Sequence, residues 1–195
     1  MLRKTVGLIL LSFLFAQANR IGQDSQPEPY NDPDAYDVYA SILLSQGLER
    51  VAQVKKLVIK AETTSYRMCL KPEKEFEPII GPAIAAYTEL NKKPYLIQPD
   101  FSIDKPYEII PASELKATFE KGGGGWKKFY EQHPDSGGSI DLSAVGFNAD
   151  KTIAVVYMAH HCGGLCGEGV FYVLQKKDGK WIPFHWEGES CSWVS

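Results

Sequence analysis

The chain has 195 residues, of which 44% are hydrophobic and 12% aromatic, and its 21 basic and 24 acidic side chains give a net charge of −3. This composition is typical of a folded domain of ordinary size and excludes a disordered chain. The negative balance argues against nucleic acid and against an anionic membrane surface as partners.

The first residues have the pattern of a cleavable secretory signal. Arg3 and Lys4 precede an apolar run at residues 6–16, and the sequence AQA at residues 16–18 supplies the small residues of a cleavage site. The run is shorter than the roughly 20 residues that span a bilayer, and no cysteine that could be lipidated follows it directly. We therefore expect residues 1–18 to be a signal peptide, and the protein to be exported to the periplasm or the cell exterior without a membrane anchor.

Residues 19–33 are polar and contain prolines, which indicates a flexible leader. The dipeptide Asp32-Pro33 is typical of a helix start, and apolar residues then recur at helical spacing until Gly47. The folded domain is therefore expected over residues 34–195.

The middle of the chain alternates short strands and helices. The expected elements are a strand at residues 57–59, a helix that begins at Pro82, a strand at residues 107–110 and a helix that begins at Ser113. Four glycines at residues 122–125 then break the chain, and a helix with an aromatic face follows. Their spacing indicates that four aromatic residues belong to the core: Trp126, Phe129, Trp181 and Trp186.

From Ile140 onward, the pattern changes to strands separated by turns. Strands are expected at residues 140–147, 152–159 and 170–174, and Asp178-Gly179 predicts a tight type I′ hairpin. These elements predict a single α+β domain in which N-terminal helices pack on a C-terminal antiparallel β-meander.

The second half of the chain resembles a family of exported bacterial proteins without an assigned activity. The resemblance is carried by SAVGFN at residues 143–148, CGGLCGEG at 162–169, DGKW at 178–181 and the closing WVS at 193–195. It implies an exported location and a shared fold, and it supplies no catalytic residues.

Four cysteines in an exported chain predict disulfide bonds. Cys162 and Cys166 flank a glycine-containing loop and favour a local pair, which leaves Cys69 to pair with Cys191. A two-residue turn at Asp178-Gly179 would instead place Cys166 opposite Cys191. Four cysteines allow three disulfide connectivities, and all three are open at this point. We favour the one that contains the local pair. No helix start that would activate a thiol follows the loop, which argues against a redox enzyme.

Three other residues are candidate metal ligands. His160, His185 and Glu187 would face one ion if the hairpin register continued and His160 lay opposite Val170. Imidazole is a good ligand for zinc or copper, and carboxylate also binds zinc. The known motifs for phosphate, calcium, zinc-protease and hydrolase-elbow sites are missing from the sequence, so no cofactor is predicted.

Two classes of function follow from these observations. The first is a non-enzymatic binding or structural module that is exported and stapled by disulfides. The second is a metal-dependent or hydrolytic enzyme that uses the histidines near the loop of residues 162–166. No motif identifies the partner or the ligand.

Overall fold

The computed structural model describes residues 26–44 and 54–195. The predicted signal peptide and the leader as far as residue 25 lie outside the described residues. No helix within the described ranges has the length and apolar character needed to cross a bilayer.

The helices are α1 (Pro33–Leu44), α3 (Glu77–Leu90), α4 (Ala112–Phe119) and α5 (Gly125–Gln132). The strands before α5 are β1 (Glu28–Tyr30), β2 (Lys56–Lys60), β3 (Lys71–Pro72), β4 (Tyr95–Ile97) and β5 (Tyr107–Ile110). Those after it are β6 (Ser136–Leu142), β7 (Gly146–Phe147), β8 (Ile153–Gly163), β9 (Cys166–Lys177), β10 (Lys180–Pro183), β11 (Gly188–Glu189) and β12 (Ser192–Val194).

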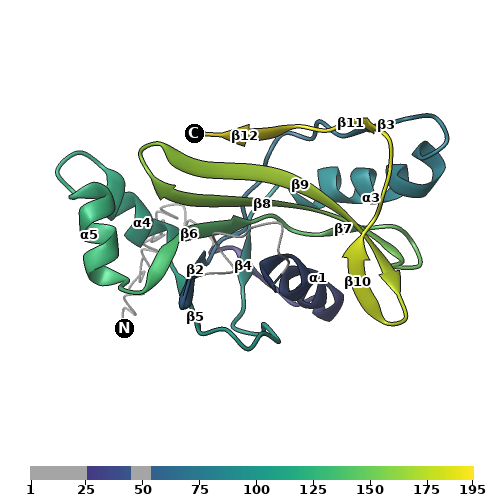
Figure 1. Cartoon of the computed structure of the whole chain (residues 1–195). Coiled ribbons are helices and arrows are strands. Elements are labelled where there is room, and N and C mark those ends of the chain that lie inside the picture. The colour runs from purple at the N-terminus through teal and green to yellow at the C-terminus, as the bar shows by residue number, and fades with distance from the viewer. Residues whose placement is uncertain (1–25, 45–53) are drawn as a thin grey trace, which may run out of the picture.

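An eight-stranded mixed sheet forms the centre of the molecule (Figure 1). Its main path is β10-β9-β8-β6-β2-β5, with β12 beside β9 and β7 beside β8. Strand β2 runs parallel to both β5 and β6, whereas the pairs from β6 through β8 and β9 to β10 are antiparallel.

The predicted fold, with N-terminal helices on a C-terminal antiparallel meander, is therefore wrong. Residues 57–59 are fully buried, so the early strand β2 lies inside the sheet rather than outside it. The segment from α4 to α5 makes the crossover that joins the two parallel strands β5 and β6. The helices are thus distributed along the chain and over both faces of the sheet.

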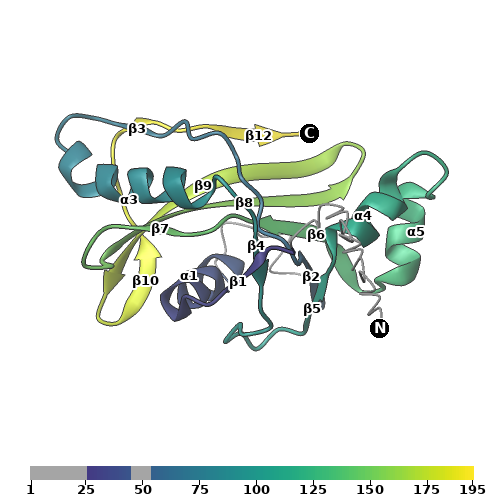
Figure 2. The same cartoon turned by 180° about the vertical axis from the view of Figure 1, so that it is seen from behind.

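The two faces of the sheet are covered by different helices (Figure 2). Alternate side chains of β8 divide between two clusters: Ala154, Val156 and Met158 pack with α1, and Val155 and Tyr157 pack with α3. In β2, Leu57 and Ile59 also face α1, whereas Val58 packs with Phe129 of α5. Helices α3, α4 and α5 therefore share the face opposite to α1.

The C-terminal hairpin has the predicted turn. Asp178 and Gly179 both have positive φ angles, of 51° and 75°, and Lys177 pairs with Lys180, as a type I′ turn requires. The register ends near Pro183, whose ring removes a backbone donor. The chain returns to β9 only in β12, where Ser192 pairs with Val170.

Candidate functional site

A pocket of about 480 Å³ opens on the sheet face that α3, α4 and α5 share. It lies where the apolar cluster beneath α4 and α5 gives way to charged side chains of the sheet. The pocket is lined by Lys60, Leu115, Lys116, Phe119, Trp126, Ser139, Asp141, His161 and Gly163. Its volume is within the range of small-molecule sites.

One wall of the pocket is apolar and comes from α4 and α5. The rings of Phe119 and Trp126 meet edge to face with their centroids 4.7 Å apart, and Trp126 also contacts the buried Phe129 at 5.3 Å. The glycines between the helices make this contact possible. A Cβ at Gly123 would lie 2.2 Å from the carbonyl oxygen of Ala117, so only glycine lets the turn fold back so closely.

The floor of the pocket is polar and comes from β2 and β6. Lys60 Nζ lies 2.9 Å from Asp141 Oδ2, and both side chains are less than 20% exposed. The hydroxyl of Thr64 donates to the same carboxylate oxygen at 3.1 Å. Ser139 and Asp141 alternate with Ile140, which faces α1, so both point to the pocket side of the sheet.

His161 of β8 lies across from Ser139 in the antiparallel pair. Its Nε2 atom is 4.0 Å from Asp141 Oδ2, and its ring packs against Trp193 of β12 at 5.4 Å between centroids. The side chain is 39% exposed. An imidazole ring is therefore held at the pocket with one edge toward a carboxylate.

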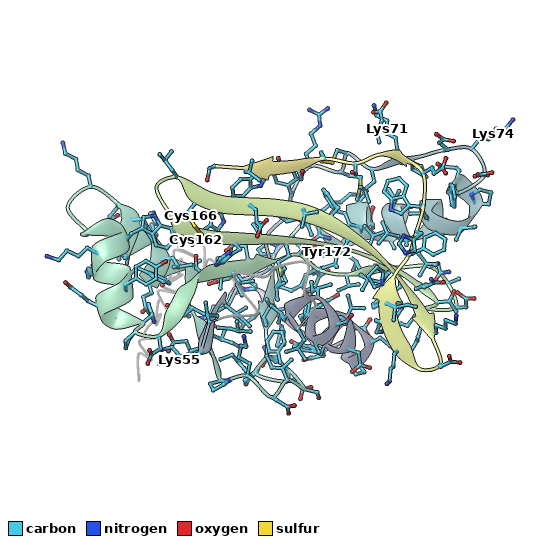
Figure 3. The ribbon with its side chains drawn as sticks, viewed as in Figure 1. Lys55, Lys71, Lys74, Cys162, Cys166 and Tyr172 are labelled. Carbon is cyan, nitrogen blue, oxygen red and sulfur yellow. A yellow bond between two sulfur atoms is a disulfide. The ribbon has the colours of Figure 1, made fainter. Side chains whose placement is uncertain are left out.

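The rim of the pocket is the tip of the β8–β9 hairpin. Figure 3 shows Cys162 and Cys166 at the end of this hairpin, next to α4 and α5, where they form a disulfide. The hydroxyl of Tyr130 in α5 donates to the carbonyl of Cys162 at 2.8 Å. Burial raises the pKa of Tyr130, which keeps this donor protonated. The helices and the hairpin tip are thereby joined beside the pocket.

The second disulfide joins Cys69 to Cys191. The structure therefore has the connectivity that the local pairing of Cys162 with Cys166 favours. The competing pair of Cys166 with Cys191 requires the hairpin register to continue past Pro183, and the register does not continue.

The candidate metal ligands do not come together. His160 pairs with Glu168 rather than with Val170, because Val170 lies opposite Met158. The His160 side chain is buried, and its Nε2 atom is 2.9 Å from the carbonyl oxygen of Gly137. His185 and Glu187 follow β10 on an exposed segment. Within residues 26–44 and 54–195, no group of three or more His, Cys, Asp or Glu side chains could hold a metal ion.

The sequence did not identify Lys60, Ser139, Asp141 or His161 as residues that line a common pocket. The available signal was the alternation of polar and apolar residues in the sequence SIDL at 139–142, which marks a polar position on an otherwise buried strand. The position of Lys60 was not accessible in this way, because it depends on the parallel pairing of β2 with β6. Of the four aromatic residues predicted for the core, Phe129 and Trp181 are buried, whereas Trp126 and Trp186 are only half-buried, and Trp126 belongs to the pocket wall.

Comparison with known proteins gives no further assignment. No protein-family model matches the chain, and no curated protein and no solved structure matches it. The chemistry of the site is therefore argued from its own residues.

Proposed function

We propose that the protein is a binding module that holds a small organic molecule in the pocket between α4, α5 and the sheet. The observation that carries this proposal is the lysine and aspartate pair on the pocket floor. Taking two charges out of water costs free energy, and an ion pair inside a fold is weak support for stability. Lys60 and Asp141 lie side by side on an otherwise largely apolar sheet face, beneath an open cavity with an aromatic wall. A few polar groups in an apolar cavity are typical of ligand sites.

The absence of an activated nucleophile favours binding over covalent catalysis. All four cysteines of the chain are in disulfides. Within the described ranges, no hydroxyl group forms a hydrogen bond with the ring of His161, although Ser139 is its partner across the strands. A serine nucleophile normally needs such a bond to its base.

Export and family membership are part of the proposal. Two disulfides are typical of an oxidising compartment, which supports a location in the periplasm or outside the cell. The motif resemblance supports membership of the family of exported bacterial proteins. Both inferences rest on the sequence patterns of the signal region and of the C-terminal half.

The test is a titration of the protein with a library of small aromatic and aliphatic molecules, followed by protein-observed NMR. We expect saturable shifts that cluster on the residues of the pocket. Phe119→Ala should weaken binding at least about tenfold, because it removes part of the apolar wall. The matched control is Ile79→Ala on α3, since Ile79 and Phe119 have similar exposures of 42% and 40%.

The proposal is contradicted if no molecule gives saturable shifts, or if Phe119→Ala and Ile79→Ala behave alike. Shifts scattered over the surface would also contradict it. Because Phe119 is partly exposed, its replacement should leave the fold intact, which the NMR spectrum itself verifies.

The second candidate is a hydrolytic enzyme that uses His161 as a general base. The observation that favours it is the position of His161 Nε2, 4.0 Å from the Asp141 carboxylate at the edge of the pocket. Hydrolysis of nitrophenyl acetate by the protein tests this alternative. A rate above that of free imidazole that is lost in His161→Gln would support the enzyme, and a rate equal in both proteins would exclude this role.

A further inference from the structure

We infer that the pocket selects an organic anion with an apolar body, such as an aromatic or branched carboxylate or sulfonate. This inference rests on the proposed binding function and specifies the chemistry of the ligand. It follows from the charge, the layout and the size of the pocket.

The charge of the pocket is positive. Lys60 is paired with Asp141, so these two groups cancel. Lys116 also lines the pocket, and within the described ranges its side-chain ammonium group forms no ion pair or hydrogen bond. One exposed ammonium group of the pocket lining is therefore not balanced by a carboxylate, and it can attract an anion to the pocket.

A cationic ligand fits this pocket poorly. The only carboxylate among the lining residues is that of Asp141, and it already accepts contacts from Lys60 and Thr64. A cation would have to displace Lys60 and would also meet the charge of Lys116. An anion instead meets an uncompensated ammonium group and an imidazole that can donate a hydrogen bond.

Helix α4 places the ammonium group of Lys116 next to the aromatic ring of Phe119. Lys116 and Phe119 are three residues apart on the helix, so their side chains lie on neighbouring positions of one face. Leu115 and Phe119 are four residues apart and lie on the same face. A ligand that contacts this face therefore meets an ammonium group next to an apolar surface, which matches a molecule with an anionic group on an apolar body.

The test compares two fluorescent probes that differ by one charged group. Anilinonaphthalene sulfonate carries an anion, and the neutral anilinonaphthalene has the same rings without the sulfonate. We expect the sulfonate to bind the intact, disulfide-bonded protein at least about tenfold more tightly than the neutral probe. Lys116→Gln should remove most of this preference, because it weakens binding of the sulfonate much more than binding of the neutral probe.

The matched control is Lys74→Gln. Lys74 is an exposed lysine that forms no ion pair within the described ranges, and it lies at the opposite end of the molecule from the Cys162–Cys166 rim (Figure 3). This variant should keep the full preference for the sulfonate, which would show that the effect is local and not a change in net charge.

The possible outcomes separate the anion preference from the binding function on which it rests. Equal affinity for both probes, with Phe119→Ala weakening both, would overturn the anion preference and leave the binding function standing. The same loss in Lys116→Gln and Lys74→Gln would also overturn it. If neither probe binds with saturation, or if Phe119→Ala changes neither affinity, the pocket is not the binding site and both proposals fail.

Discussion

Phe129 supports the aromatic wall of the pocket from below. Its ring is fully buried and contacts the rings of Phe119, Trp126, Tyr130 and His133. We expect Phe129→Ala to lower the free energy of unfolding by about 3–5 kcal/mol, because it leaves a cavity inside this cluster. Denaturant unfolding followed by circular dichroism measures the loss. A loss as small as that of the partly exposed Phe119→Ala would contradict this role.

Asp34 provides a stability that depends on pH. Its carboxylate accepts a hydrogen bond from Lys176 at 2.8 Å and another from Lys151 at 3.1 Å, and these contacts hold the pKa of Asp34 below its usual value. A carboxyl whose pKa is lower in the folded state stabilises the fold above its unfolded pKa of about 4 and loses this contribution as the pH falls further.

Asp34→Asn should therefore destabilise the protein at neutral pH, and the difference from the wild type should shrink as the pH falls below about 4. The midpoint of thermal unfolding across this range measures it. Asp37→Asn on the same helix is the control, because Asp37 is exposed and forms no ion pair in the described ranges. A difference that stays constant down to the lowest pH at which the protein folds would refute the assignment.

The sequence predicted core aromatic residues better than it predicted pocket residues. Phe129 and Trp181 are buried as expected, because each fits an apolar face of its own element. Trp126 has the same helical spacing but lies at the start of α5 and contacts both the cluster that contains Val58 and the pocket that contains the charged Lys60. Spacing along one helix carries no information about that neighbour.

At the scale of elements, the two disulfides should differ in their contribution to stability. The Cys69–Cys191 bond spans 122 positions of the chain and the Cys162–Cys166 bond spans four. Loop-closure entropy gives about 5 kcal/mol for the long ring and about 2 kcal/mol for the short one. Replacing each pair by alanine and measuring denaturant unfolding tests this order.

The short ring has a second role at the pocket. Gly163 lies inside it and lines the pocket. Replacing Cys162 and Cys166 should therefore weaken probe binding more than replacing Cys69 and Cys191 does.

For stability, the expected order is the reverse. A larger loss of stability on removal of the Cys162–Cys166 bond than on removal of the Cys69–Cys191 bond would contradict the loop-closure explanation.

The two long strands and the hairpin turn of the second half could be predicted from the sequence, whereas the long-range pairing within the sheet could not. The strands of β8 and β9 and the turn at Asp178-Gly179 follow from apolar runs and turn residues close together in the chain. The pairing of β2 with β6 joins residues about 80 positions apart, so no local pattern predicts it. Because Lys60 reaches Asp141 only through this pairing, the floor of the pocket was equally hidden from the sequence.

The start of helix α3 was also predicted at the wrong residue. A proline favours a helix start, and the sequence predicted one there. Helix α3 instead begins at Glu77 and contains Pro82 in its interior. The helix also has Pro78 near its first position, which supplies the actual start.

At the scale of the whole molecule, the signal peptide remains a prediction. Mass spectrometry of the exported protein should find Asn19 at the N-terminus, since the residues before it end in a small-x-small cleavage motif. Cells that also express a variant with Ala18→Lys are the control, because a charged residue at this position should block cleavage. Recovery of the intact wild-type chain from the cytoplasm would contradict export.

In the whole molecule, the polar side chains of the pocket lie together on the part of the sheet that no helix covers. On the face opposite to α1, α3 covers one part of the sheet with an apolar cluster, and α4 and α5 cover another. The uncovered part carries Lys60, Asp141 and His161. The long-range pairing of β2, the glycine turn before α5 and the disulfide at the hairpin tip all contribute to its shape.

The most direct test is a crystal structure of the protein with anilinonaphthalene sulfonate. We expect the probe's rings to lie against Phe119 and Trp126, and its sulfonate to lie within hydrogen-bond distance of Lys116. A probe bound elsewhere on the protein, with the pocket unoccupied at saturating concentration, would show that this pocket is not the binding site.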